Sequence, residues 1–186
     1  MSRVGRRKEF IVPIMKKMSF AGASLLWGAV AAAVIAADRE VKHLILTSFT
    51  EGTVMGELPG FFDFIYVRNT GAAFSLFSDM TLLLGIVSVL FCICVAVYWF
   101  IRKPKSNVKR AAVALLFAGA LGNAFDRLFY GFVVDFISLK WFDFPVFNIA
   151  DSAIVIGALL VVVYVAFFDK ADKKDEDDKN DGKERN

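Results

Sequence analysis

The sequence is poor in the residues that most metal sites and thiol-based sites require. Among 186 residues there is one histidine, His43, and there are two cysteines, Cys92 and Cys94. The cysteines fall within a long apolar run, and two residues apart on a helix they point in different directions, which argues against a disulfide or a metal site. A lone histidine also rules out a two-histidine zinc motif and leaves the thiols without a catalytic partner. We therefore expect no metal and no cofactor, and we interpret His43 as an interfacial residue.

Charged residues are missing from four long stretches, whereas apolar types make up 57% of the chain and twenty residues are Phe. A hydrocarbon core of about 30 Å takes about 20 helical residues to cross, so these stretches predict four transmembrane helices. The uncharged runs in the third and fourth spans hold only fifteen and seventeen residues, so polar residues should complete them. The expected spans are about 18–37, 80–101, 109–126 and 149–168.

Basic residues are unevenly distributed among the segments outside these spans. Residues 1–17 hold six Lys or Arg against one acid, and 102–110 hold five against none, whereas 38–79 hold three against six. The four spans predict one membrane domain over 18–168. Because segments rich in Lys and Arg stay in the cytoplasm, both termini are predicted to be cytoplasmic. The polar tail, 169–186, is expected to be disordered. The net charge of +3 then reflects topology, and it does not support nucleic-acid binding.

The external segment 38–79 has the pattern of short strands. "LTSFT" at 46–50 and "FDFIYVRN" at 62–69 alternate in polarity, and "EGTVMGELPG" between them is rich in turn residues. We expect a small sheet lying on the membrane. The predicted fold is therefore an all-α membrane protein of four transmembrane helices, with a small extracytoplasmic β-sheet cradle between helices 1 and 2.

The outer ends of the third and fourth spans carry the same polar motif. "GNAFDR" places Asn123 three residues before Asp126, with Arg127 next, and "FNIADS" places Asn148 three residues before Asp151. Residues three and four apart share one face of a helix, so each motif presents its Asn and Asp together. Asn is a good N-cap and a carboxylate suits the first turn, so helix capping remains an alternative for the second motif.

A third carboxylate, Asp135, lies between the two motifs in "VVDF". Two facing carboxylates share a proton, so one can act as a base towards water and the other as an acid towards a scissile carbonyl oxygen. Because Arg127 would hold Asp126 ionised, whereas Asp135 has no adjacent base, Asp135 is favoured as the partner of Asp151. This pair predicts aspartic protease chemistry.

Two other classes of function remain as alternatives. Carboxylates within a membrane also serve ion pathways, so a proton-coupled transporter or small channel is possible in principle, with charges expected near the middle of the spans. In a structural or assembly protein the same polar groups would join helices to each other. The clustering of the carboxylates on one side favours the protease.

Five motifs together resemble one known family. "DREVK", "VRNTGAAFS", "GALGNAFDR", "VVDF" and "PVFNIADS", in this order among four spans, are similar to the lipoprotein signal peptidase (signal peptidase II) family over roughly 20–168. The resemblance implies an aspartic endopeptidase of the bacterial inner membrane, with its active site at the periplasmic face. It would remove the signal peptide from diacylglyceryl-modified prolipoproteins, cutting before the lipidated Cys. The expected partners are these substrates, membrane lipids and cyclic-peptide inhibitors of the family, with a monomeric enzyme.

The resemblance also implies roles for individual residues. Asp135 and Asp151 correspond to the catalytic pair. The chain departs from the family at Arg39, where the usual residue is Gln. The resemblance therefore does not predict the polar contacts that Arg39 makes. The supporting or substrate-binding positions are Asn123, Asp126, Arg127, Asn148, Ala150, Asn69, Gly71, Asp38 and Lys42.

Simpler interpretations exist for several supporting residues. Asp38 and Lys42, four residues apart, could form an ion pair at a helix end. Gly71 could be a turn residue that Asn69 stabilises. Arg127 could be an interfacial anchor, although beside carboxylates we favour a role in fixing one of them or a substrate carbonyl group.

Overall fold

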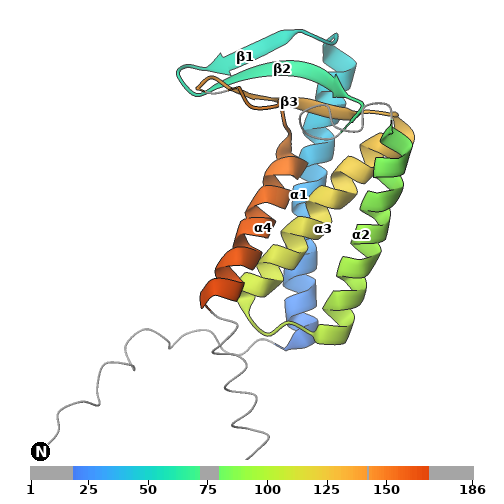
Figure 1. Cartoon of the computed structure of the whole chain (residues 1–186), viewed down its shortest axis with the longest axis vertical. Helices are drawn as coiled ribbons and strands as arrows, with labels where there is room; N and C mark the ends of the chain where they lie inside the picture. The colour runs from blue at the N-terminus through green and yellow to red at the C-terminus, as the bar shows by residue number, and fades with distance from the viewer. Residues whose placement is uncertain (1–18, 72–79, 142, 168–186) are drawn as a thin grey trace, which may run out of the picture.

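A computed structural model describes residues 19–71, 80–141 and 143–167. Within these residues a bundle of helices carries a small sheet across one end (Figure 1). The predicted cytoplasmic segments 1–17 and 169–186 lie outside the described residues. In chain order the elements are α1 (Phe20–Ser48), β1 (Val54–Leu58), β2 (Phe62–Asn69), α2 (Thr81–Arg102), α3 (Asn107–Phe129), β3 (Val133–Leu139) and α4 (Ile149–Phe167).

The described part contains four helices that are long and apolar enough to cross a membrane, as the sequence predicted. α1 is longer than its expected span, because it begins after the N-cap Ser19 and continues to Ser48. Its 29 residues correspond to about 44 Å, more than the roughly 30 Å of a hydrocarbon core. The strand predicted over 46–50 was therefore wrong, since its first three residues are the last of α1.

α3 is the central helix of the bundle, and it packs against the other three (Figure 1). Its buried positions are mostly small, which lets neighbouring backbones approach closely. At Gly119 an added Cβ would collide with the backbone oxygen of Ala150 and would lie 2.7 Å from Ile154 Cγ1. At Gly157 it would lie 2.9 Å from the Leu116 side chain. Glycine at these positions sets the distance between α3 and α4.

The sheet is antiparallel with the strand order β1-β2-β3. β1 and β2 come from the segment between α1 and α2, so the predicted cradle is confirmed there. β3, which was not predicted as a strand, comes from the connection between α3 and α4. A register shift in the β2–β3 pairing lies between Phe64 and Val67. The third strand brings residues from the second half of the chain into the cradle.

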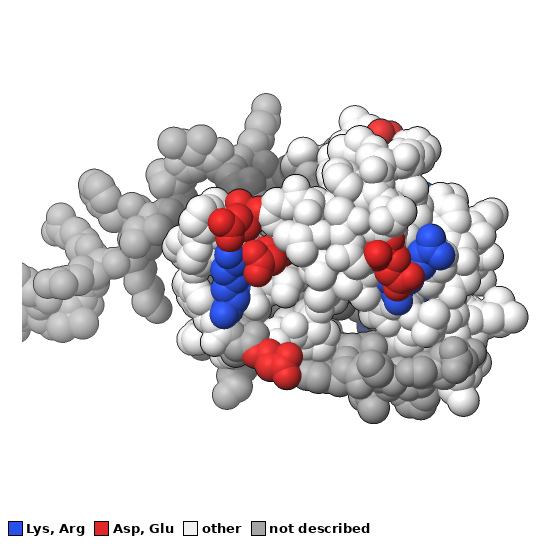
Figure 2. All heavy atoms as spheres, turned by 90° about the horizontal axis from the view of Figure 1, so that it is seen from above, with Lys and Arg blue, Asp and Glu red and all other residues white. Residues whose placement is uncertain are grey.

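A compact apolar cluster joins the sheet to the end of α1. Ile45 of α1 packs with Tyr66 of β2 and with Val134 and Phe136 of β3, and all four are buried. The face of the sheet seen from above is mostly uncharged, with basic groups next to acidic ones (Figure 2). These ion pairs include Lys140 with Glu57 and Asp63, and Arg68 with Glu51.

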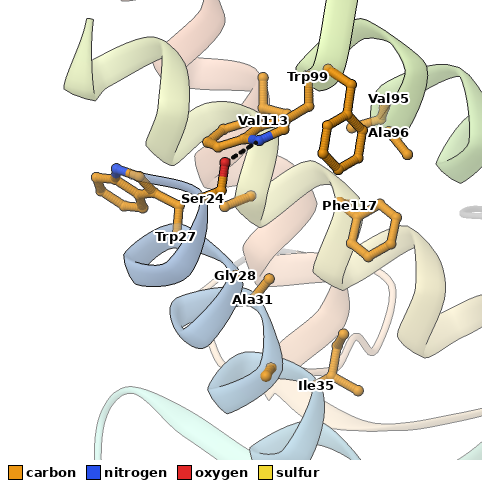
Figure 3. Close-up of a pocket in the computed structure, with 13 residues that line it drawn as sticks. Ser24, Trp27, Gly28, Ala31, Ile35, Val95, Ala96, Trp99, Val113 and Phe117 are labelled. Carbon is orange, nitrogen blue, oxygen red and sulfur yellow. Dashed lines mark hydrogen bonds between the residues drawn. The ribbon is translucent and has the colours of Figure 1, made fainter. Parts of the chain in front are cut away.

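The half of the bundle away from the sheet contains an apolar pocket of about 340 Å³ between α1, α2 and α3 (Figure 3). Its lining includes Gly28, Ala31 and Phe117, and its polar contact is a 3.0 Å hydrogen bond from Trp99 Nε1 to Ser24 Oγ. No lining residue is titratable. This pocket therefore offers no acid–base chemistry, and the functional site must be sought at the other end.

Candidate active site

The two carboxylates favoured by the sequence meet where the sheet rests on the bundle. Asp135 is in the middle of β3, and Asp151 is in the first turn of α4. The segment before α4 pairs with β3, because Phe147 and Ile137 exchange backbone hydrogen bonds of 3.0 and 2.8 Å. This pairing places Asn148, which follows Phe147, beside Asp135.

Asp135 is nearly inaccessible, with 2% of its surface exposed. Its two oxygens accept hydrogen bonds from amide groups, Oδ2 from Asn69 Nδ2 at 2.9 Å and Oδ1 from Asn148 Nδ2 at 2.7 Å. Burial, and secondly the nearby charge of Asp151, raise the pKa of Asp135 to about 7, against opposing effects of Asn69, Lys42 and Asn148. Near neutral pH this carboxyl group therefore exchanges readily between its protonated and ionised forms.

Asp151 and Asn148 form a reciprocal cap at the start of α4. Asn148 Oδ1 accepts from the Asp151 N–H at 2.8 Å, and Asp151 Oδ2 accepts from the Asn148 N–H at 3.2 Å. This is the geometry of a capping box. The other oxygen of Asp151 accepts from Asn123 Nδ2 at 2.6 Å. The capping interpretation was correct, and the same Asn148 side chain also holds Asp135.

A buried lysine connects the pair to α1. Lys42 is fully buried, and its ammonium group contacts Asp38 at 2.8 Å, Asp126 at 2.9 Å and Asn123 Oδ1 at 3.1 Å. Asp38 in turn accepts the backbone N–H of Ala150 at 3.0 Å. The predicted ion pair between Asp38 and Lys42 is present, and it also supports the start of α4.

Asp126 is fully buried and serves as a structural acceptor rather than as a neighbour of Asp151. Its Oδ2 accepts from Lys42 and, at 3.3 Å, from the backbone N–H of Val134, while its Oδ1 pairs with Arg39. Arg127 does not pair with it. Arg127 instead donates from Nη2 to the Gly71 carbonyl oxygen at 3.1 Å, and its Nε is buried without a hydrogen-bond partner among the described residues.

Asn69 combines the two roles considered for it. Its Oδ1 accepts the Gly71 N–H at 2.9 Å, which stabilises the turn after β2, and its Nδ2 contacts Asp135. Gly71 is thus held from both sides, by Asn69 and by Arg127. The turn and the carboxylate are parts of one hydrogen-bonded arrangement.

A pocket of about 430 Å³ opens onto both carboxylates. Its polar lining comes from Asn69, Arg127, Asp135, Asp151 and Ser152, and the rest is largely apolar. Asp151 is partly exposed, whereas Asp135 is buried, so the two present different faces to a bound molecule. The pocket can hold an apolar segment with a polar bond above the carboxylates.

The described residues provide no group of three or more His, Cys, Asp or Glu that could bind a metal ion. His43 is exposed on α1. Cys92 is buried and Cys94 exposed, both as free thiols.

The structure brings all of the predicted site residues into one region, and it adds others that the sequence did not identify. Arg39 contacts Asp126, and Ser152 lines the pocket. A signal for Arg39 was available, because it lies three residues before Lys42 and one after Asp38, at the same end of the helix. The contribution of the Val134 backbone N–H could not be read from residue types.

Comparisons with known proteins agree with this geometry. The chain matches the sequence profile of the family described as Signal peptidase (SPase) II over residues 30–167. A lipoprotein signal peptidase of Clostridium acetobutylicum is 39% identical over 149 residues, covering 78% of this chain and 96% of the relative. One from Staphylococcus aureus is 38% identical over 166 residues, covering 88% of this chain and 99% of the relative.

A solved structure, described as a bacterial membrane enzyme structure by the in meso method at 2.3 Å resolution, is also similar. It superimposes with a TM-score of 0.73 at 34% sequence identity, covering 82% of this chain and 93% of that one. The residues that the profile matches include the sheet and both carboxylates. The chain belongs to the signal peptidase II family, the lipoprotein signal peptidases, and it is a multi-pass protease of the bacterial inner membrane.

Proposed function

We propose that Asp135 and Asp151 are the catalytic pair of an endopeptidase that cleaves diacylglyceryl-modified prolipoproteins before the lipidated Cys. The observation that carries the proposal is the position of Asn148, whose backbone and side chain contact both carboxylates at the floor of one pocket. Three amide side chains surround the pair, so each carboxylate keeps hydrogen bonds in either protonation state. The pair can therefore hold and exchange a single proton.

The chemistry follows from that shared proton. The ionised carboxylate takes a proton from water as the water oxygen attacks the scissile carbonyl carbon, and the protonated carboxyl donates its proton to the carbonyl oxygen. A tetrahedral intermediate forms without a covalent enzyme adduct. When the C–N bond breaks, the carboxyl group that took the water proton gives it to the leaving nitrogen. The other carboxylate takes a proton from one hydroxyl of the intermediate, so that the carbonyl group re-forms and the pair again holds one proton. The pKa of Asp135, raised to about 7, suits a group that must give and take a proton near neutral pH.

Arg127 and the turn after β2 are the proposed contacts for the peptide. Arg127 lines the pocket and has a buried Nε without a partner in the described structure, so it can donate to a substrate carbonyl oxygen. Gly71 and Asn69 lie directly beside it. The edge of the sheet supplies backbone groups that can pair with an extended chain.

The location of the pair suits a lipid-anchored substrate. Phe129 and Trp141 near the sheet are 70% and 65% exposed, as expected for aromatic side chains in the headgroup layer. These side chains support a location of the sheet end at a membrane interface, and in the proposed orientation this is the outer one, with the opposite end of the bundle in the cytoplasm. A substrate held by its acyl chains would present its scissile bond at that depth. Membrane lipids and cyclic-peptide inhibitors of the family would meet the same surface, and the proposed enzyme acts as a monomer.

The test is cleavage of a lipidated precursor peptide by purified enzyme in detergent, with sequencing of the new N-terminus. We expect the parent enzyme to make a single cut before the modified Cys, and we expect no cut by Asp135→Asn or by Asp151→Asn. An unmodified peptide serves as the matched substrate control. A cut elsewhere, or undiminished cutting by both variants, would refute the proposed site. The alternative function, a transporter, would need ionisable groups near the middle of its spans.

A further inference from the structure

We propose that Arg39 is a positioning residue for the reaction. Arg39 binds one oxygen of Asp126, and this keeps the other oxygen on the backbone N–H of Val134, the residue that precedes Asp135. The inference rests on the proposed catalytic role of Asp135. It assigns Arg39 a part in catalysis.

The Arg39 side chain is held on every side by α3 and the residue after it. One guanidinium nitrogen, Nη1, pairs with Asp126 Oδ1, and Nη2 donates to Tyr130 Oη at 3.0 Å. The guanidinium carbon lies 4.1 Å from the centre of the Phe125 ring and 5.5 Å from that of Tyr130. Only 20% of the side chain is exposed. These contacts direct the guanidinium group towards Asp126.

Asp126 divides its two oxygens between different partners. Oδ1 faces Arg39, whereas Oδ2 faces Lys42 at 2.9 Å and the Val134 N–H at 3.3 Å. Lys42 lies on the Oδ2 side, where its ammonium group forms ion pairs with Asp38 and Asp126 and donates to Asn123 Oδ1, so it is not positioned to replace Arg39 at Oδ1. Without Arg39 the buried Oδ1 would lack a partner, and the carboxylate would rotate to regain one.

That rotation would act on the strand that carries Asp135. The Val134 N–H, near the start of β3, would lose its acceptor. Val134 is completely buried in the apolar cluster that joins the sheet to α1. The carbonyl oxygen of the same residue faces Asn148 Nδ2 at 3.4 Å. A shift of Val134 would therefore move Asp135 relative to Asn148 and Asp151.

The chemistry of arginine suits this task better than that of other cations. Its planar group can lie on aromatic rings and donate in two directions at once, and it remains charged when partly buried. A lysine would keep the charge, but its compact ammonium group would lack the planar fork that reaches Asp126 and Tyr130 while lying on the Phe125 ring. A glutamine would keep one donor but would leave Asp38 and Asp126 with only the charge of Lys42.

The experiment compares Arg39→Gln, Arg39→Lys and Arg68→Gln as purified enzymes on a lipidated precursor peptide. Arg68 is the matched control, since its guanidinium also pairs with a carboxylate, Glu51, and lies over an aromatic ring, that of Phe132, but it is half exposed. Size-exclusion chromatography and thermal unfolding give the folded fraction, and kcat is corrected for it. We expect Arg39→Gln to lower kcat about tenfold or more at a KM within about twofold, because displaced groups lose turnover rather than binding.

Arg39→Lys should recover part of the lost kcat, and Arg68→Gln should match the parent enzyme. If Arg39→Gln fails to fold, Arg39→Lys must still show a lowered kcat at unchanged KM. A double-mutant cycle then tests the route: Arg39→Gln should cost no further turnover in the Asp126→Asn background. Parent-like kcat in the folded Arg39 variants, or fully additive losses, would overturn the inference.

The two proposals can fail separately. Full turnover by Asp135→Asn would remove the catalytic pair, and the role of Arg39 would fall with it. Loss of turnover by Asp135→Asn together with parent-like kinetics of both Arg39 variants would leave the catalytic pair intact and reject only the positioning role.

Discussion

Asn148 shows how a single side chain can serve both the fold and the chemistry. Its Oδ1 caps the start of α4 through the Asp151 N–H, and its Nδ2 donates to Asp135. The amide oxygen and nitrogen have opposite hydrogen-bonding roles, so an isosteric carboxylate could not replace it. Structural capping and catalytic support therefore coincide in one residue, and neither interpretation excludes the other.

Replacing Asp135 by Asn should abolish turnover while leaving a folded enzyme that still binds the precursor. The amide keeps the shape but can neither hold the shared proton nor act as a base, and acid–base groups contribute about 10²–10⁴-fold. Cleavage rates and pull-down of a lipidated precursor by purified protein provide the measurement. Asp126→Asn should instead reduce thermal stability and lower kcat less, because Asp126 holds Val134, Lys42 and Arg39. Equal losses in both variants would contradict this division of roles.

Activity should fall on the alkaline side with an apparent pKa of about 7. The pKa of Asp135 is raised to about 7 by burial and by Asp151, so the shared proton is bound below that pH and released above it. With the proton lost, no carboxyl group remains to protonate the carbonyl oxygen. Initial rates at saturating substrate from pH 5 to 9, with enzyme stability checked at each pH, give the profile. A rate that stays constant up to pH 9 would argue against this assignment.

At the scale of elements, the apolar runs were sufficient to predict the four helices, but the strands depended on distant partners. The alternation at 46–50 predicted a strand, but these residues begin in the last turn of α1. Ile45, just before them, is buried against the sheet, and Thr47 Oγ1 donates to the His43 carbonyl oxygen at 2.9 Å within the helix. β3 is a short apolar run whose partner, β2, lies far away in the sequence. Its pairing is visible only in three dimensions.

The site shows the same limit. Spacing and residue context were enough to nominate Asp135 and Asp151, because carboxylates among apolar residues are conspicuous. The position of Arg39 near Asp38 and Lys42 was visible in the sequence, but its contact with Asp126 and the contact of the Val134 N–H were not predictable, since they depend on how α1, α3 and β3 approach one another. Patterns along one helix reveal a shared face, whereas contacts between elements require the fold.

The close packing of α3 on α4 predicts a sharp contrast between two glycines. Gly119→Ala should lower the unfolding temperature and reduce turnover, because its Cβ would meet the Ala150 carbonyl, beside Asp151, and overpacking costs about 1–3 kcal/mol. Gly28→Ala in α1 is the control, since nothing lies within 4 Å of its Cβ. That change should be neutral or stabilising by up to about 1 kcal/mol. Thermal unfolding in detergent measures both, and equal effects would contradict the packing argument.

At the scale of the whole molecule, the chain enters and leaves the bundle at one end, and the proposed active site lies at the other end. The start of α1 and the end of α4 lie opposite the sheet (Figure 1). The connection between α2 and α3 at the same end carries Lys103 and Lys105. Basic residues next to spans favour the cytoplasm, and this distribution supports the proposal that the site faces outward.

Cysteine labelling should reveal this orientation. In a background without Cys92 and Cys94, Ser138→Cys on β3 should react with a membrane-impermeant maleimide in intact cells. Ser106→Cys, before α3, should react only after the membrane is opened. The two positions control for each other in a single experiment. External labelling at position 106 would overturn the proposed topology.

The separation of Asp135 and Asp151 onto a sheet and a helix means that proteolytic competence is acquired late. A newly inserted chain can have every helix in the bilayer and still hold one carboxylate on an undocked strand. The amide that holds Asp135 from β2 lies 66 residues away, so translation must pass α2 and α3 before the contact can close. Cleavage by the proposed pair is therefore expected only after β3 has docked beside β2 and the start of α4.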